Sequence, residues 1–331
     1  MLIGACSLVI GELTVRLLQS IDNLPDDVKR GALSIGNFDG VHRGHARLVE
    51  RLLARARELR GPAIVFTFDP HPVRLLRPDS APRPLTWTDR KAELLAELGV
   101  NAVIAYPTDE ALLALSPEQF FQRIVGEKLA ARSMVEGPNF FFGHNRAGSI
   151  DTLMTLCLAA DISLEIVPPI SIGREIVSSS RVRAAVQAGD VDLARQLLTR
   201  PYRIRGMVTH GAGRGAKLGF PTANLAGIDT LLPAQGVYAA QAITPAGNWP
   251  AAVNIGPNPT FGEQALKVEA HLIGFHGTLY GQPLEIEFLS RLRSIRPFES
   301  IEALKAQVQH DIAAAQQIEA TEPDDDEDTV G

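Results

Sequence analysis

Two histidines at the start of an expected helix have the spacing and the setting for phosphate chemistry. The stretch 31–48 reads GALSIGNFDGVHRGHARL, in which the apolar run Ala32 to Ile35 predicts a buried strand, followed by a glycine turn and a helix-forming run. His42 and His45 are three residues apart and therefore share one face of the first helical turn. The start of a helix attracts phosphate because its first backbone N–H groups are free. We expect these imidazoles to bind the oxygens of a nucleoside triphosphate and to stabilise charge that develops on its α-phosphorus.

The turn between this strand and this helix supplies further candidates for phosphate binding. Gly36, Asn37 and Asp39 precede the histidines in the string GNFDGVHRGH. Two solvated histidines in a glycine-rich turn are the alternative interpretation. The complete string, however, is similar to the HxGH signature of the nucleotidyltransferase superfamily, whose members transfer a nucleoside monophosphate from a triphosphate. The strand before it and the helix after it favour the catalytic interpretation.

A second anion site is predicted where the string SSSRVR, residues 178–183, begins another helix. Hydroxyl groups and backbone N–H groups hold an anion at such a position, and a guanidinium can bind it through two hydrogen bonds. We assign Ser179, Ser180 and Arg183 to this site. An ordinary helix N-cap is the alternative, but the motif follows a strand in a chain that already contains HxGH.

A glycine-rich stretch in the second half, HGAGRGAKLGFPTANL at 210–225, predicts a flexible loop whose backbone N–H groups wrap phosphates. Gly213, Arg214 and Lys217 are its candidate phosphate-binding residues. The stretch is not a Walker loop, because the GxxxxGK[ST] spacing and the helix that should follow are missing.

Two polar residues directly after this loop are candidate metal ligands. Thr222 and Asn224 alternate on an extended segment, so that both side chains face one side. They offer the hard oxygen ligands that Mg²⁺ prefers while it bridges phosphates. A glycine-rich β-turn with a structural threonine and asparagine is the alternative.

A carboxylate in a later strand is the candidate general base. Glu269 lies in LKVEAHL, where Val268 and Ala270 face the opposite way from Glu269 and His271. We expect Glu269 on the inner face of a barrel mouth, where it can accept a proton from an alcohol. An ordinary surface glutamate is the alternative.

Strands that alternate with helices in the first half predict an α/β domain with a parallel sheet, covered by helices on both faces. Further strands are expected at 62–68, 101–107, 134–136 and 162–168. Helices are expected at 43–59 and 88–98, from Ser116 to about Ala131, and from about Asp151. Ser116 has the N-cap, N1 proline and capping-box glutamine that mark a helix start.

After residue 203 the helical pattern gives way to short alternating runs, which predict a small closed antiparallel β-barrel. These runs occupy 202–208, 236–244, 249–256, 266–275 and 284–292, and a helix from 300 to about 317 follows. Domain boundaries are therefore expected at 12–187, with a helical connector at 188–202, a barrel domain at 203–320 and a tail at 321–331.

Composition limits the classes of protein that the chain can represent. Its 331 residues fit two domains, with 45% hydrophobic and 21% charged residues. The net charge of −6 comes from six carboxylates in 322–328, so the remaining chain is balanced, which argues against a nucleic-acid binder. The acidic tail is expected to be disordered.

Two features of the sequence indicate the cellular compartment. The N-terminus is apolar, but it lacks a basic region and is too short to cross a bilayer, so neither a signal peptide nor a membrane anchor is expected. Cys6 and Cys157 are too few for a disulfide framework. A cytoplasmic protein follows from these observations.

Several long strings, in a fixed order, carry a family resemblance over nearly the whole chain. They are GNFDGVHRGH, FDPHP, NFFFGHNRAG, SSSRVR, GRGAKLGFPTANL, GVYAA, NIGPNPTF, VEAHLIGF and LRSIRPFES. The chain resembles the bacterial bifunctional riboflavin kinase/FAD synthetase family. The resemblance implies that the N-terminal half makes FAD from FMN and ATP, and that the C-terminal barrel phosphorylates riboflavin with Mg²⁺ and ATP.

The resemblance also implies roles for individual residues. In the N-terminal half, His42 and His45 match phosphate-binding histidines, and the second phosphate motif is matched by Ser179, Ser180 and Arg183. In the barrel, Thr222 and Asn224 match the magnesium and phosphate ligands, and Glu269 matches the kinase base. The implied flavin contacts are Asn139, Phe68 and Phe220. Mild departures occur at Asp69, Ser180 and Ala270. Ile295 and Pro297 replace charged residues of the family pattern, which puts contacts at those two positions in doubt.

Two other functions are compatible with the same sequence. One is an adenylyltransferase for another phosphorylated substrate, with the barrel as a binding module. The other is a flavin-binding regulator without catalysis, which the presence of His42, His45 and Glu269 argues against.

Overall fold

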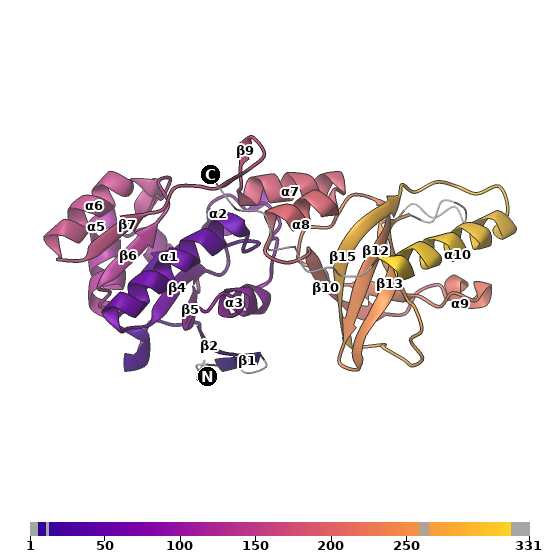
Figure 1. The fold of residues 1–331 in the computed structure, drawn as a ribbon, viewed down its shortest axis with the longest axis horizontal. Coiled ribbons are helices and arrows are strands. Elements are labelled where there is room, and N and C mark those ends of the chain that lie inside the picture. Colours follow the sequence, from indigo (N-terminus) through magenta and orange to yellow (C-terminus); the bar gives the residue numbers. More distant parts are fainter. Residues whose placement is uncertain (1–5, 11–12, 258–259, 261–264, 319–331) are drawn as a thin grey trace, which may run out of the picture. The chain divides into compact units, whose positions relative to one another are not determined.

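The computed structural model describes residues 6–10, 13–257, 260 and 265–318 (Figure 1). The expected disordered tail and the start of the N-terminal segment lie outside these residues. Packing divides the chain into two compact units. The first contains the described residues up to Pro82 together with Trp87–Ser178, and the second contains Arg83–Thr86 and the described residues from Ser179 onward.

The first unit is built on a seven-stranded sheet in the order β1-β2-β5-β4-β3-β6-β7. The pairing of β1 with β2 is antiparallel and the other pairings are parallel. The strands are β1 (Cys6–Ile10), β2 (Leu13–Leu18), β3 (Ala32–Ile35), β4 (Ala63–Phe68), β5 (Ala102–Tyr106), β6 (Ser133–Glu136) and β7 (Ser163–Ile166), and a separate hairpin joins β8 (Ser171–Ile172) to β9 (Glu175–Ile176).

Helices cover both faces of this sheet, as the alternation of strands and helices predicted (Figure 1). Residues of α1 and α3 pack on one face against Ala32 and Val65, while residues of α5, η3 and α6 pack on the other face against Leu33 and Phe66. The helices are η1 (Asp26–Val28), α1 (Arg43–Leu59), α2 (Pro72–Leu76), η2 (Pro78–Ser80), α3 (Thr88–Glu97), α4 (Glu110–Leu113), α5 (Pro117–Phe120), η3 (Phe121–Lys128), η4 (His144–Arg146) and α6 (Ile150–Ala159).

One helix differs in form from the expectation. Ser116 caps α5 with the predicted capping box, but the helix continues as the π-helix η3 instead of an α-helix to Ala131. The amide of Leu129 accordingly bonds to the carbonyl of Ile124, five residues earlier. Both helix types bury one apolar face, so hydrophobic periodicity does not distinguish them.

The second unit is a closed antiparallel barrel in the order β10-β11-β14-β13-β12-β15, as predicted. Pairing of β10 with β15 closes it. Its strands are β10 (Arg203–Thr209), β11 (Ala223–Ala226), β12 (Gly236–Thr244), β13 (Gly247–Gly256), β14 (Lys267–Leu272) and β15 (Pro283–Arg293), and its helices are α7 (Ser179–Ala188), α8 (Val191–Leu197), α9 (Arg214–Leu218) and α10 (Ile301–Gln317). The packing thus groups residues 179–187 with the barrel unit, although the sequence analysis placed them in the first domain.

Candidate active sites

The β3–α1 turn is held in an unusual backbone conformation at the carboxyl end of a central strand. Phe38 and Val41 have φ values of 47° and 41°, which non-glycine residues rarely adopt. Both side chains are buried in the core, and this burial keeps the turn in place. Gly36 packs against the Phe38 ring, where a Cβ would lie 3.2 Å from Cε2.

The two histidines of the predicted phosphate site lie side by side at the start of α1. Their rings stack with centroids 3.7 Å apart, and the Nδ1 of His42 accepts a hydrogen bond of 3.3 Å from the backbone N–H of His45. The proton of a neutral His42 is therefore on Nε2. Burial lowers the pKa of His45 well below its ordinary value, and the positive charges of His42 and Lys91 add to this effect. The imidazole of His45 is then neutral at neutral pH and can donate one hydrogen bond.

An apolar cavity of about 500 Å³ adjoins this turn. Gly36 and Asn37 line it at one side, and Phe68 and Asn139 come to it from β4 and from the loop after β6. The structure thus brings together the two flavin candidates of the first unit and part of the phosphate turn. The aromatic rings of Phe140, Phe141 and Phe142 also line this cavity and give it a lining suited to a flat ring system.

The second phosphate motif lies at the start of α7, which packs with the barrel unit. Ser180 is exposed, and Ser179 and Arg183 are half-buried. The Nε of Arg183 donates a hydrogen bond of 3.4 Å to the carbonyl of Arg83. An approach of these residues to the histidine pair therefore stays a prediction.

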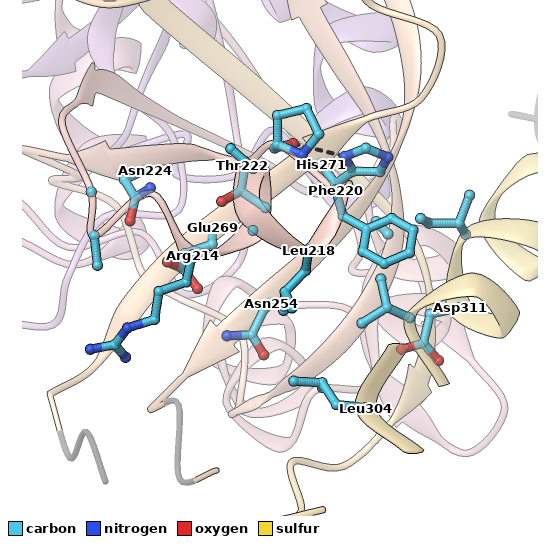
Figure 2. A pocket seen from close by; sticks show the side chains of 18 of the residues that line it. Arg214, Leu218, Phe220, Thr222, Asn224, Asn254, Glu269, His271, Leu304 and Asp311 are labelled. Carbon is cyan, nitrogen blue, oxygen red and sulfur yellow. Dashed lines mark hydrogen bonds between the residues drawn. The ribbon is translucent and has the colours of Figure 1, made fainter. Parts of the chain in front are cut away.

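A second cavity, of about 230 Å³, lies against the barrel wall and contains the predicted kinase residues (Figure 2). Asn224, Glu269 and Asn254 are direct neighbours across β11, β14 and β13. They form one polar row on the sheet surface. Leu304 and Asp311 of α10 also line this cavity.

The position of Glu269 corrects one expectation. Val268 and Ala270 are buried inside the barrel, with 4% and 0% exposure, so Glu269 is on the outer face of the wall and not on the inner face. The alternation correctly predicted that Glu269 faces the opposite way from Val268 and Ala270. These two apolar residues, however, are the ones that fill the interior of the closed barrel. The cavity that receives Glu269 is formed outside the barrel by the 211–222 segment and α10.

The predicted glycine loop contains a short helix, α9, and it passes very close to the polar row. A Cβ on Gly211 would lie 2.2 Å from the Asn224 amide nitrogen, so any larger residue there would displace the Asn224 side chain. Gly213, Arg214, Phe220 and Thr222 line the cavity as expected. Lys217 is exposed and is not among the described residues that line it.

Hydrogen bonds fix the segment that carries Thr222. The Nδ1 of His271 donates to the Pro221 carbonyl at 2.8 Å, shown by the dashed line in Figure 2. His271 was placed on the same face as Glu269 by the strand pattern, but its positioning contact was not predicted. The sequence also did not indicate that Asn254 lines the second cavity or that Lys91 lowers the pKa of His45. A lone asparagine in a strand and a lysine in a helix have no distinctive spacing.

Two residues that line the second cavity, Arg293 and Asp311, form an ion pair. Arg293 at the end of β15 donates two hydrogen bonds of 3.0 and 2.8 Å to Oδ2 of Asp311 in α10. Asp311 is only 4% exposed. Neither Ile295 nor Pro297, the two departures from the family pattern, is among the described residues that line this cavity.

Comparison with known proteins agrees with this division into two sites. A family model described as FAD synthetase matches residues 24–181, and one described as riboflavin kinase matches residues 198–319. The bifunctional riboflavin kinase/FMN adenylyltransferase of Pseudomonas fluorescens is 36% identical over 92% of this chain and 98% of its own. The protein of that description from Bacillus subtilis is 33% identical over 90% of this chain and 95% of its own. This chain belongs to the family of bifunctional riboflavin kinase/FMN adenylyltransferases.

Members of this bifunctional family phosphorylate riboflavin to FMN and adenylylate FMN to FAD, and this chain does both. Riboflavin, FMN and ATP are its substrates. A crystal structure titled as a macrolide-efflux protein from Streptococcus pneumoniae is similar in fold, with a TM-score of 0.81 and 26% identity over 91% of this chain and 98% of that one. Among the described residues, no helix is both long and apolar enough to span a membrane.

Proposed function

We propose that the cavity beside the histidine pair carries out adenylyl transfer and that the cavity on the barrel wall carries out the kinase reaction. The observation that supports this most strongly is the polar row Asn224–Glu269–Asn254, which places one carboxylate between two amides on a cavity wall. In this assignment the FMN adenylyltransferase domain comprises residues 12–187 and the kinase domain 203–320, with 188–202 as the connector between them.

In the kinase reaction, Glu269 takes the proton of the ribityl 5′-hydroxyl of riboflavin. The hydroxyl oxygen then forms a bond to the γ-phosphorus of ATP, the bond from that phosphorus to the bridging oxygen breaks, and ADP leaves. Gly213 and Arg214 bind the ATP phosphates, and Phe220 contacts the flavin. Lys217, although exposed, keeps its assignment as a phosphate ligand.

Magnesium is the ion that the kinase cavity suits. The hydroxyl of Thr222 and the amide oxygen of Asn224 are hard ligands, and both line the cavity close to Glu269. Mg²⁺ in such sites is held by few protein ligands and is shared with substrate phosphates. When bound, Mg²⁺ supplies positive charge to the ATP phosphates.

In the adenylyl-transfer reaction, a phosphate oxygen of FMN forms a bond to the α-phosphorus of ATP and pyrophosphate leaves. His42 and His45 donate hydrogen bonds to the phosphate oxygens as charge develops there, and Gly36, Asn37 and Asp39 shape the phosphate turn. Ser179, Ser180 and Arg183 bind further phosphate oxygens, and Phe68 and Asn139 contact the flavin. No protein base is required, because the FMN phosphate is already ionised near neutral pH. We also propose a cytoplasmic location, where ATP is available.

Substitution of the magnesium ligands tests this assignment. Thr222→Val removes a hydroxyl but preserves volume, so riboflavin phosphorylation should need more Mg²⁺, with FAD formation from supplied FMN unchanged. Titration of both activities with Mg²⁺ measures this. Thr244→Val, at the end of β12 in the same unit, where the hydroxyl bonds to its own hairpin turn, is the matched control. An unchanged Mg²⁺ requirement of the kinase would remove Thr222 from the proposed site.

A further inference from the structure

A buried lysine lies beneath the phosphate turn of the first unit. Lys91, on α3, is only 7% exposed. A buried ammonium carries a large desolvation cost unless its surroundings compensate, so such a residue is seldom present without a specific contact. Burial indeed lowers the pKa of Lys91, while the carboxylates of Asp39 and Asp69 act in the opposite direction.

The hydrogen bonds of Lys91 lead directly to the turn. Its Nζ is 3.3 Å from Oγ1 of Thr67, which is fully buried at the end of β4. An ammonium can only donate, so the Thr67 oxygen accepts from Lys91 and its one proton goes elsewhere. That proton is donated to the carbonyl of Asn37, at 3.0 Å. Because Lys91 donates to the Thr67 oxygen, the Thr67 hydroxyl donates to the Asn37 carbonyl, and this second hydrogen bond holds Asn37 at the start of the turn.

The groups around Lys91 come from three segments that meet at one edge of the sheet. Asp39 belongs to the β3–α1 turn, Asp69 follows β4, and Lys91 belongs to α3. The carboxylates of Asp39 and Asp69 offset part of the desolvation of the Lys91 ammonium. The hydrogen bonds from Lys91 to Thr67 and from Thr67 to Asn37 join α3, β4 and the β3–α1 turn. We propose that Lys91 is a positioning residue of the adenylyl-transfer site, which holds the β3–α1 turn in place through the hydroxyl of Thr67.

A second consequence of this placement concerns the histidines. The positive charge of Lys91 opposes protonation of His45 and contributes to the low pKa of that imidazole. His45 Nδ1 is buried and has no hydrogen-bond partner among the residues that the structure describes. Lys91 therefore influences both the shape of the turn and the protonation state of the imidazole that the turn leads to. This inference rests on the proposed role of the histidine pair.

The test uses the full chain with Lys91→Met, which preserves length but removes the charge, and Thr67→Val, which removes only the hydroxyl. Lys29→Met, a surface lysine of the same unit paired with Asp26, is the control. We expect Lys91→Met to lower kcat for FAD formation on the order of 100-fold, because misplaced catalytic groups cost about that much. Riboflavin phosphorylation in the same molecule should stay at the wild-type rate, which shows that the barrel unit is folded. Cooperative urea unfolding, followed by Trp87 fluorescence in a Trp249→Phe background, shows whether the first unit is folded.

Nuclear magnetic resonance of labelled histidine separates positioning from simple support of the fold. The His45 resonance, assigned by its absence in His45→Ala, should titrate at a higher pH in Lys91→Met, because the opposing cation is gone. Thr67→Val should lower kcat while the His45 pKa stays at the wild-type value. A wild-type kcat in either variant, or an inactive Lys91→Met with an unchanged His45 pKa, would overturn the proposal. If His45→Ala itself retained FAD synthesis, the assigned role of the histidines would fail instead.

Discussion

At the scale of single residues, the two sites use opposite kinds of group. The proposed adenylyl-transfer site has imidazoles as hydrogen-bond donors, with the pKa of His45 held low by burial and by neighbouring positive charge. The proposed kinase site has a carboxylate, Glu269, between two amides. The difference follows from the reactions, because an ionised phosphate needs no base and an alcohol benefits from one.

Replacement of Glu269 by glutamine tests the kinase assignment. The change preserves size and most hydrogen bonding but removes the proton acceptor. Loss of a general base typically lowers a rate by about 10²- to 10⁴-fold, so FMN formation should collapse to that extent. Conversion of supplied FMN to FAD should continue. Glu302→Gln, an exposed position on α10, is the control, and near wild-type phosphorylation by Glu269→Gln would show a structural glutamate.

Glu136 provides a test based on pH. It is 2% exposed, burial raises its pKa well above 4.5, and its Oε1 accepts the backbone N–H of Ile35 at 2.7 Å. A carboxylic acid whose pKa is higher in the folded chain than in the unfolded chain stabilises the fold at a pH below the unfolded pKa. That stabilisation is lost as the pH rises from the unfolded pKa toward the folded pKa. The native carboxyl therefore loses stabilisation as the pH rises above about 4.3, the ordinary pKa of a glutamate.

Glu136→Gln removes this titration but keeps the acceptor. The free energy of unfolding of the variant, relative to wild type, should rise as the pH increases through this range. Urea unfolding in a Trp249→Phe background measures it, because Trp87 is then the only tryptophan and lies in the first unit. A difference independent of pH would show that Glu136 is ionised in the folded chain.

At the scale of elements, the sequence predicted the parallel sheet and the closed barrel because their signals are long. The apolar run before Gly36 and the alternation around Glu269 determine where strands lie. Which face of β14 is interior was not available from alternation, since only closure of the barrel decides it. The burial of Lys91 could not be predicted for a similar reason. A lysine in an amphipathic helix normally faces water, and only the packing of α3 buries this one.

One ion pair joins α10 to the end of β15 in the barrel. Asp311→Ala leaves the Arg293 guanidinium, with 20% of its side chain exposed, without its carboxylate. Breaking such a pair costs about 3 kcal/mol, and we expect that loss in the second unit. Trp249 fluorescence in a Trp87→Phe background reports it, with Glu302→Ala on the same helix as the control. An unchanged midpoint would show that apolar contacts alone hold α10.

At the scale of the whole molecule, one chain carries two active sites that use ATP in different ways. The two family models match separate segments of the chain, and each unit has its own cavity. FMN is the product of one site and the substrate of the other. Damage to one site should therefore leave the other active.

Removal of the acidic end should have little effect at this scale. Residues 322–331 contain six carboxylates and only one strongly apolar residue, Val330, so they have little to contribute to a core. A chain that ends at Thr321 should retain its thermal midpoint and both activities. Calorimetry and the two assays check this, and a large fall in the midpoint would mean that the tail packs against the body.

The central claim is that His42 and His45 serve only the second reaction, and one time course tests it most directly. The chain is incubated with riboflavin and Mg-ATP while FMN and FAD are separated and measured. Wild type should show FMN first and FAD later. In His42→Ala/His45→Ala, FAD formation should fall at least about 100-fold, because lost oxyanion donors cost on that order, while FMN accumulates at the wild-type rate. An equal loss of FMN and FAD formation in the folded variant would contradict the two-site account.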